Sequence, residues 1–197
     1  MKKILFISSR PIYPIVGGDQ IRTAQQLNFL TEKYCVDVLY LSATNNTENI
    51  QKEQPKIRAE YKFYLPKIIS CLHTFYFLFN FLPLQVNYYY SKKAEKYIKN
   101  NLYKYDAVFC NNIRTAEYVR KAKGIIKIID FVDAISMNYE KAKDKASGIK
   151  KMIYTIDYWR CKRYEQLIFK TFDSCAIISN VDKQYILYGN KDLCGRK

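Results

Sequence analysis

The sequence predicts an α/β fold with a doubly wound, mainly parallel sheet and helices on both of its faces. Apolar segments typical of strands alternate with helical segments along the whole chain, and most connections between them are short. Residues 125–132 are almost entirely apolar, as expected for a strand that is covered on both faces. Parallel strands need crossover connections, and the helical segments between the strands supply them.

The first forty residues set this pattern. Residues 3–8 form a short apolar run typical of a buried strand, and residues 10–18 form a loop with two prolines and a glycine pair. A helix follows, in which four residues share one face: Ala24, Leu27, Leu30 and Tyr34. Residues 36–41 predict a second strand, so the chain opens as strand, glycine loop, helix and strand.

The glycine pair, Gly17 and Gly18, allows two interpretations. Without a Cβ atom the backbone could adopt positive φ and approach a ligand closely, and the helix N-terminus behind it would favour phosphate or another anion. An ordinary turn between a strand and a helix also uses glycine, so both interpretations remain open at this point.

The middle of the chain is less regular. Its expected elements are a loop over 44–60, a short strand over 61–65, an apolar helix over 68–84 and a lysine-rich helix over 91–103. The apolar helix should end before Pro83, because the residue before a proline is biased away from helical geometry. Ser91 is the expected N-cap of the lysine-rich helix.

Three further strands are expected in the second half, over 106–110, 125–132 and 174–178. Residues 111–115 should turn into a helix that ends near Gly124. The last predicted segments are a helix over 179–188 and a tail over 190–197 that has no pattern.

A long helix ending near Thr171 should precede the last of these strands, with a charged segment over 140–151 leading into it. One face of this helix collects apolar side chains and is expected to pack on the core: Ile149, Met152, Ile153, Ile156 and Leu167. Arg160 and Arg163 fall on the same side, close to Glu165, and an inward arginine normally pairs with a carboxylate or lines a cleft.

Composition narrows the possible partners. The chain has 197 residues and 49% hydrophobic content, so it can form a full core. Its net charge of +15 should favour anionic partners such as nucleic acid, anionic lipid or phosphorylated ligands. Solvated lysines in a chain of biased composition would give the same charge. The six cysteines form no CxxC pair and only one histidine, His73, is present, which argues against a structural zinc site.

In open α/β sheets, ligands bind beyond the carboxyl ends of the strands. This rule selects five clusters as candidate sites: 10–18, 41–44, 111–114, 130–136 and 179–182. Asp130 lies inside an apolar run, so its buried carboxylate needs a partner, and we expect a structural hydrogen bond there.

The motif Ser-Arg-Pro-x-x-Pro-x-x-Gly-Gly-x-x-x-Arg over 9–22 resembles the opening of GT-B-fold glycosyltransferases of family four. Residues 129–136, then Arg-Tyr-Glu over 163–165 and Phe-Asp over 172–173, resemble a subgroup of that family linked to bacterial exopolysaccharide assembly. The resemblance implies a Rossmann-like acceptor-side domain over 1–189. Family members add a second domain that binds the nucleotide-sugar donor, and here residues 190–197 would be a tail or the start of a linker to it.

The same resemblance implies the roles of the candidate residues. Asp133 would orient or deprotonate an acceptor hydroxyl, although relatives often have a histidine near this place. The candidate substrate-binding residues are Gly17, Gly18, Arg22, Arg114, Ser136 and Ser179. Ser179 could equally cap a helix, and Arg22 could equally be an ordinary surface arginine. No metal or other cofactor is expected, since the nucleotide sugar is a substrate.

The leading hypothesis is therefore half of a retaining, cytoplasmic glycosyltransferase that acts on a glycan or polyprenyl-linked acceptor in cell-surface polysaccharide synthesis. We expect this chain to be inactive without the donor-binding domain. The alternatives are a basic nucleic-acid-binding protein, for which no recognition motif is visible, and a non-catalytic partner protein. Residues 75–84, with the tyrosines and lysines that follow, form either an ordinary core helix or an apolar and basic patch on the inner membrane surface.

Overall fold

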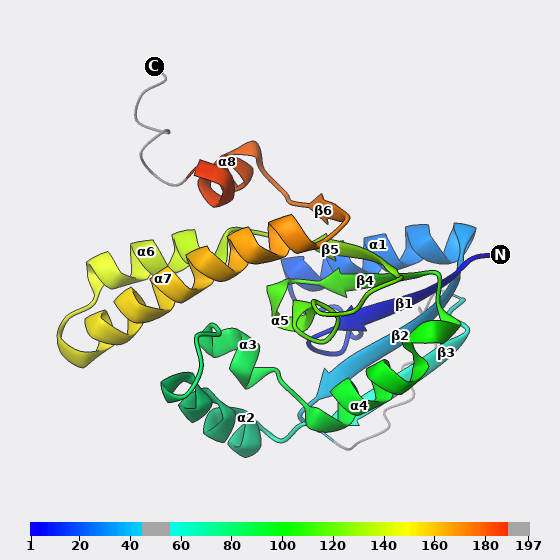
Figure 1. The fold of residues 1–197 in the computed structure, drawn as a ribbon, viewed down its shortest axis with the longest axis horizontal. Coiled ribbons are helices and arrows are strands. Elements are labelled where there is room, and N and C mark those ends of the chain that lie inside the picture. The colour runs from blue at the N-terminus through cyan, green and yellow to red at the C-terminus, as the bar shows by residue number, and fades with distance from the viewer. Residues whose placement is uncertain (45–55, 189–197) are drawn as a thin grey trace.

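The computed structural model describes residues 1–44 and 56–188 and contains a six-stranded sheet (Figure 1). The strands are β1 (Lys3–Ser8), β2 (Cys35–Ser42), β3 (Ala59–Tyr64), β4 (Ala107–Asn111), β5 (Ile126–Asp130) and β6 (Ser174–Ala176). All five pairings are parallel, and the order is β3-β2-β1-β4-β5-β6. The predicted doubly wound, parallel α/β fold is confirmed.

The strand order reverses next to β1, where β2 continues the sheet on one side and β4 on the other. Because all strands are parallel, their carboxyl ends lie at one edge of the sheet. The ends of β1, β4 and β5 at Ser8, Asn111 and Asp130 are therefore neighbours at the position where such folds bind ligands.

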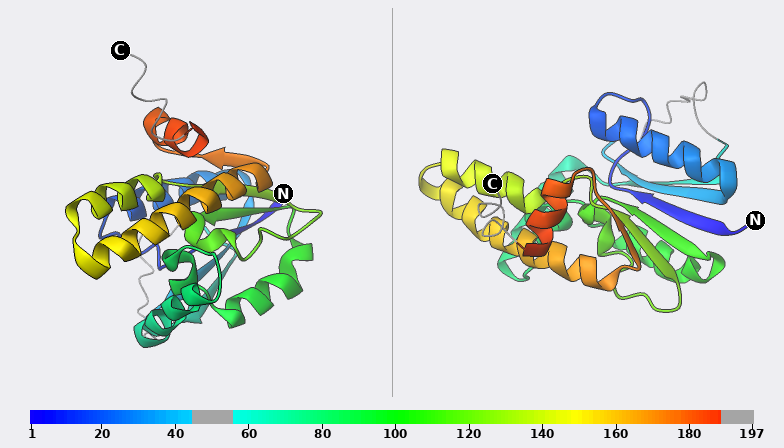
Figure 2. Two further views of the ribbon diagram at one scale, coloured as in Figure 1. Left: turned by 60° about the vertical axis from the view of Figure 1, so that its left-hand side comes forward. Right: turned by 90° about the horizontal axis from the view of Figure 1, so that it is seen from above.

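Helices cover both faces of the sheet, as predicted (Figure 2). On one face, α1 (Gly18–Lys33) buries its apolar stripe, which includes Ala24 and Leu27, against β1, β2 and β4. The larger core on the other face includes residues of α4 (Lys92–Asn101), α5 (Ile113–Ala116) and α7 (Gly148–Thr171). Ser91 caps α4 as expected, with Ala94 N donating to its Oγ at 3.4 Å.

The apolar segment over 68–84 is not one helix, so that prediction was wrong. It contains α2 (Lys67–Thr74) and the 3₁₀ turn η1 (Phe75–Leu78), and a separate helix, α3 (Leu84–Tyr88), begins after Pro83. Asn80 explains the break, because its Oδ1 accepts Leu82 N at 2.9 Å and its Nδ2 donates to Asn87 Oδ1 at 2.9 Å.

Two other helix predictions also differ from the structure. The helix after β4 is only the single turn α5 and does not continue to Gly124. The charged segment over 140–151 was expected only to lead into the long helix, but its first part belongs to a separate helix, α6 (Ile135–Lys145). This helix packs along α7 as a hairpin that reaches beyond the carboxyl ends of the strands (Figure 1). Gly148 begins α7 with φ of +57°, a conformation that glycine adopts without strain.

The face of α7 that packs on the core is also different from the predicted one. Ile149, Met152, Ile156 and Leu167 are exposed, and a different set of side chains is buried: Asp157, Tyr158, Cys161, Tyr164, Glu165 and Ile168. Asp157 and Glu165 lie on this inner face, so the pattern of apolar residues alone predicted the wrong face of α7 as the buried one.

The remaining described elements are η2 (Leu102–Lys104) and α8 (Asn180–Tyr188). The predicted tail over 190–197 and residues 45–55 of the predicted loop lie outside the described residues. Within the described part of the chain, no helix is both long and apolar enough to span a bilayer.

Candidate active site

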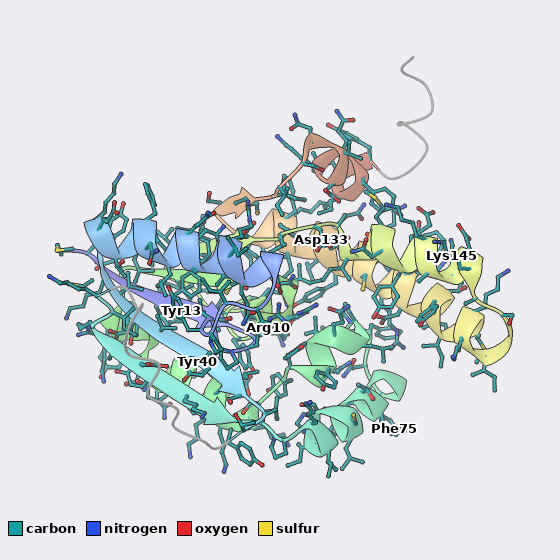
Figure 3. The ribbon with its side chains drawn as sticks, turned by 180° about the vertical axis from the view of Figure 1, so that it is seen from behind. Arg10, Tyr13, Tyr40, Phe75, Asp133 and Lys145 are labelled. Atoms are coloured by element: carbon teal, nitrogen blue, oxygen red, sulfur yellow. The ribbon has the colours of Figure 1, made fainter. Side chains whose placement is uncertain are left out.

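A small polar cavity, here called the rim cavity, lies at the carboxyl ends of β1, β4 and β5. Its volume is about 140 Å³, several times the roughly 30 Å³ that one water molecule occupies. It is lined by Ser8, Ser9, Arg10, Pro11, Ile12, Asp19, Gln20, Thr23, Asn111, Asn112, Arg114, Val132 and Asp133. Figure 3 labels Arg10 in the loop after β1 and Asp133 in the loop after β5.

The loop after β1 is held against α1 by the side chain of Gln20. Its Oε1 accepts Val16 N at 2.9 Å and Gly17 N at 3.2 Å, and its Nε2 donates to the carbonyl oxygen of Pro11 at 3.1 Å. Arg10 forms an ion pair with Asp19, the acidic residue in the first turn of α1. These contacts hold a guanidinium and a carboxylate in the cavity lining.

Two residues with positive φ border the cavity, and neither is glycine. Asn112 has φ of 70° and caps α5 with its side chain, whereas Val132 has φ of 67°, which is strained for a β-branched residue. Such strained backbone clusters at functional sites, because there the surrounding structure holds it in place. Here both residues follow strands whose ends meet at the cavity.

Asp130 links the end of β5 to α1 and to the loop that contains Val132. Its carboxylate is fully buried and accepts Arg22 Nε at 2.6 Å, Arg22 Nη2 at 3.0 Å and Gln26 Nε2 at 2.5 Å. It also accepts Val132 N at 3.1 Å, which fixes the strained residue before Asp133. The expected structural hydrogen bond of Asp130 is confirmed.

Arg22 is therefore engaged in a bidentate pair with Asp130 rather than pointing into the cavity lining. The hydrogen bonds that Arg22 donates to Asp130 raise the pKa of Arg22 above its ordinary value, so the arginine stays charged. An anion at the start of α1 would have to compete with this buried carboxylate for the same guanidinium.

Asp133 and Arg114 are the two predicted site residues that the structure brings together in the cavity lining. Asp133 is partly exposed, and its Oδ2 accepts Asn138 Nδ2 at 2.6 Å. Arg114 donates from Nε to Gln85 Oε1 at 2.7 Å and stacks over the ring of Tyr89 at 5.1 Å. Both side chains are thus oriented by neighbours outside the cavity.

Gly17 and Gly18 lie beside the cavity but do not line it. Gly17 is the N-cap of α1 with φ of −139°, and Gly18, the first helical residue, does not have positive φ either. The interpretation that this pair supplies positive φ was therefore wrong. A Cβ at Gly17 would lie 3.2 Å from Asp19 Oδ1, whereas one at Gly18 would meet nothing within 4 Å.

Ser136 and Ser179 lie away from the rim cavity. Ser136 is fully buried, and its hydroxyl and backbone N–H both donate to the carboxylate of Glu165. Ser179 caps α8 by accepting Asp182 N at 3.0 Å, and it lines a separate cavity of about 370 Å³ between β6 and α8. The structure gives both serines structural hydrogen bonds.

Glu165 lies near Asp133, and the pKa of Glu165 is raised. Burial raises the pKa of its carboxyl to about 7, although the hydrogen bonds from Ser136 act in the opposite direction. The nearby carboxylate of Asp133 adds to the increase. A buried carboxyl group with a pKa near neutral therefore lies close enough to Asp133 to interact with it electrostatically.

Two roles were expected for Arg160 and Arg163, pairing with a carboxylate or lining a cleft, and both residues line a cavity. The carboxylate of Glu165 binds Ser136. Arg163 is exposed and lines an apolar cavity with Phe81 and Trp159. His73 lies on α2, where its ring packs near Tyr76 at 5.8 Å between centroids, and it is not part of the rim cavity lining.

The sequence predicted some of the clusters that meet at the rim cavity but not all of the residues that line it. Three of the five predicted clusters meet at the cavity, whereas 41–44 and 179–182 contribute nothing to its lining. Ser8, Asn111 and Asn112 were missed as individual candidates. The available signal was their position at a strand end, which does not separate them from ordinary turn residues.

Within residues 1–44 and 56–188, no three His, Cys, Asp or Glu side chains are grouped so that they could hold a metal ion. The polar lining instead offers hydroxyl, amide, guanidinium and carboxylate groups. These groups can donate to and accept from a polyhydroxyl ligand.

A sucrose-phosphate synthase from Thermosynechococcus elongatus has a similar structure, with a TM-score of 0.60 and 16% sequence identity over 95% of this chain and 45% of that chain. The two proteins therefore share a Rossmann-like α/β fold. This domain also matches a UGT2 of Phytolacca americana, solved with UDP-2-fluoro-glucose and pterostilbene. That match has a TM-score of 0.47 and 10% identity over 92% of this chain and 49% of the other, and we draw nothing from it.

The domain spans less than half the length of either solved structure. No protein-family profile matches the sequence, and no curated protein matches it.

Proposed function

We propose that this domain is the acceptor-side half of a retaining glycosyltransferase. It moves a sugar from a nucleotide-sugar donor to a glycan or polyprenyl-linked acceptor in cell-surface polysaccharide synthesis. The observation that carries the proposal is the rim cavity, in which Asp133, Arg10 and Arg114 meet at the carboxyl edge of a GT-B-type sheet. The family-four and exopolysaccharide assignments rest on the motif over 9–22 and on residues 129–136.

In the proposed reaction, the carboxylate of Asp133 takes the proton of the acceptor hydroxyl as that oxygen bonds to the anomeric carbon of the donor. The bond between the anomeric carbon and the donor diphosphate breaks, and the nucleoside diphosphate leaves with both electrons. Retention requires the acceptor oxygen to arrive on the face from which the diphosphate leaves. Asn138 orients Asp133, and Asp130 fixes the backbone that precedes it. Arg114 binds the acceptor from the other side of the cavity. Gly17, Gly18 and Arg22, at the start of α1, remain proposed contacts on the side of the donor diphosphate.

A second domain binds the nucleotide sugar in this proposal, and the reaction takes place on the cytoplasmic side of the inner membrane. The chain by itself should then release no nucleotide from a sugar nucleotide. Measurable turnover by the purified 197-residue chain would contradict the requirement for a second domain.

The catalytic assignment is tested by Asp133→Ala in a protein that also contains the donor-binding domain. Loss of general-base assistance should lower the transfer rate by about 10²- to 10⁴-fold. Asp144→Ala is the matched control, because Asp144 is an exposed carboxylate on α6. If Asp133→Ala keeps the normal rate while the protein stays folded, Asp133 is not the base.

The competing nucleic-acid function predicts steep salt dependence, because phosphate contacts release counterions. A gel-shift experiment with single- and double-stranded oligonucleotides at modest salt should show no complex. A stable complex under those conditions would replace the glycosyltransferase proposal with a nucleic-acid-binding one.

A further inference from the structure

The region around α2 carries an unusual amount of exposed apolar surface. Phe79 and Phe81 are 84% and 87% exposed, and Ile68 is 76% exposed. The same stretch exposes four more large apolar side chains: Ile69, Leu72, Phe75 and Tyr76. Figure 3 labels Phe75 at the outer side of this segment, away from the sheet. A folded domain in water rarely leaves so many apolar groups together without a partner for them.

This surface continues onto α7. Phe81 lines an apolar cavity of about 420 Å³ together with Trp159 and Leu167 of that helix. From Trp159 the exposed stripe of α7 extends through Ile156 and Met152. We call the exposed apolar side chains of residues 68–81 and this stripe of α7 the apolar patch.

Within the two segments that form the apolar patch, the exposed charges are all of one sign. No acidic residue occurs between Tyr61 and Ala94, and Lys67 at the start of α2 is exposed. On α7 the only two acids, Asp157 and Glu165, are buried, while the exposed charged residues are basic: Lys150, Lys151, Arg163 and Lys170. The apolar patch therefore presents hydrophobic and cationic groups without any exposed carboxylate.

We propose that the apolar patch docks on an anionic lipid bilayer. Exposed aromatic and aliphatic side chains enter the boundary between headgroups and acyl chains, and lysine and arginine side chains beside them bind the lipid phosphates. Phe79 and Phe81 are the two most exposed large apolar side chains that the structure describes in this segment, so their rings are available for insertion into the bilayer.

This inference does not depend on sugar transfer. It uses neither the rim cavity nor Asp133, and Asp133→Ala should leave lipid binding unchanged. If sugar transfer fails its own test, docking on lipid can still hold, and the reverse is also true.

The experiment is sedimentation of the 197-residue chain with vesicles of phosphatidylglycerol and phosphatidylcholine in equal parts, compared with pure phosphatidylcholine vesicles. The protein should bind the anionic vesicles, and high salt should weaken the binding. Trp159 is the only tryptophan in the chain and is 56% exposed at the patch, so its emission should shift to shorter wavelength on binding.

The double variant Phe79→Ser, Phe81→Ser should weaken binding to anionic vesicles by about tenfold or more, since two large apolar side chains no longer enter the bilayer. Tyr103→Ser is the matched control, because Tyr103 is 80% exposed on η2, outside the patch. Both variants should stay folded, because the removed rings make few contacts in the domain.

Three results would overturn the proposal. The folded chain fails to bind anionic vesicles, the double variant binds as well as the Tyr103→Ser control, or the emission of Trp159 does not shift. A dimer in light scattering that dissociates in the double variant would assign the patch to a second copy of the chain instead.

Discussion

Each face of α7 carries side chains that are unusual for a helix on the surface of a domain. The inner face buries two carboxylates, Asp157 and Glu165, and the outer face exposes Met152, Ile156 and Trp159. Each inner carboxylate accepts the backbone N–H of another helix at its N-terminus. Asp157 Oδ1 binds Leu84 N at the start of α3 at 2.8 Å, and Glu165 Oε1 binds Ser136 N near the start of α6 at 3.1 Å.

The comparison of the two faces shows that side chains of α7 are buried for their hydrogen bonds as well as for their hydrophobicity. The first N–H groups of a helix have no partner within that helix, so a buried N-terminus needs an acceptor from elsewhere. A carboxylate suits that position because it also meets the positive end of the helix dipole. The inner face of α7 supplies acceptors to α3 and α6, and its outer face is left with apolar side chains that nothing in the described domain covers.

The largest expected effect is on the inner face, for Glu165→Ala. The substitution removes the acceptor of Ser136 N and of the Ser136 hydroxyl and leaves a buried cavity, so stability should fall by about 4 kcal/mol. Urea unfolding measures this change. Glu32→Ala, an exposed glutamate on α1, is the control and should stay within about 0.5 kcal/mol of the unchanged protein.

The stability of the domain should depend on pH through the titration of Glu165. The pKa of Glu165 is raised to about 7 in the folded state, so between pH 4.5 and 7 the folded state binds more protons than the unfolded state. The contribution of protonated Glu165 to the free energy of unfolding is fully present below pH 4.5. It is lost as the pH rises through 7, and the total loss is about 3 kcal/mol.

Thermal unfolding between pH 4.5 and 8 tests this dependence. Glu165→Gln should flatten the decline, because a glutamine does not titrate. An equally steep decline in Glu165→Gln would place the titrating group elsewhere. Asp157, whose pKa burial also raises, would be the first alternative.

A smaller loss is expected for Asp157→Asn. The asparagine Oδ1 can still accept Leu84 N, and the charge that burial disfavours is removed, so the change should be about 1 kcal/mol or less. Asp157→Ala loses the acceptor and should cost more than the asparagine variant. Equal losses for the two variants would show that the contact with α3 contributes little.

The smallest effect is expected on the outer face. Met152→Ser and Ile156→Ser should each change the stability of the chain by no more than about 0.5 kcal/mol, since neither side chain is buried. A loss of stability as large as that expected for Glu165→Ala would mean that the outer face of α7 is covered in solution. The two faces of the helix would then not differ in burial.

The sequence by itself determined the class of the fold and the edge where chemistry is expected. Alternating strand and helix patterns require crossovers, parallel strands share one carboxyl edge, and the clusters that follow β1, β4 and β5 therefore meet there. It also predicted that Asp130 needs a partner, because a carboxylate within an apolar strand cannot stay unpaired. These conclusions depend on local periodicity and covalent connectivity, which a sequence carries directly.

Tertiary structure alone decided which partners the polar groups found. That Arg22 pairs with Asp130, 108 positions away in the chain, and that Ser136 binds Glu165 depends on the packing of segments far apart in sequence. The same holds for α7, where apolar periodicity selected the outer face because the needs of α3 and α6 for acceptors are not visible in its own residues. Hydrogen-bond partners across a fold are set by three-dimensional proximity, and the local pattern of residues does not encode them.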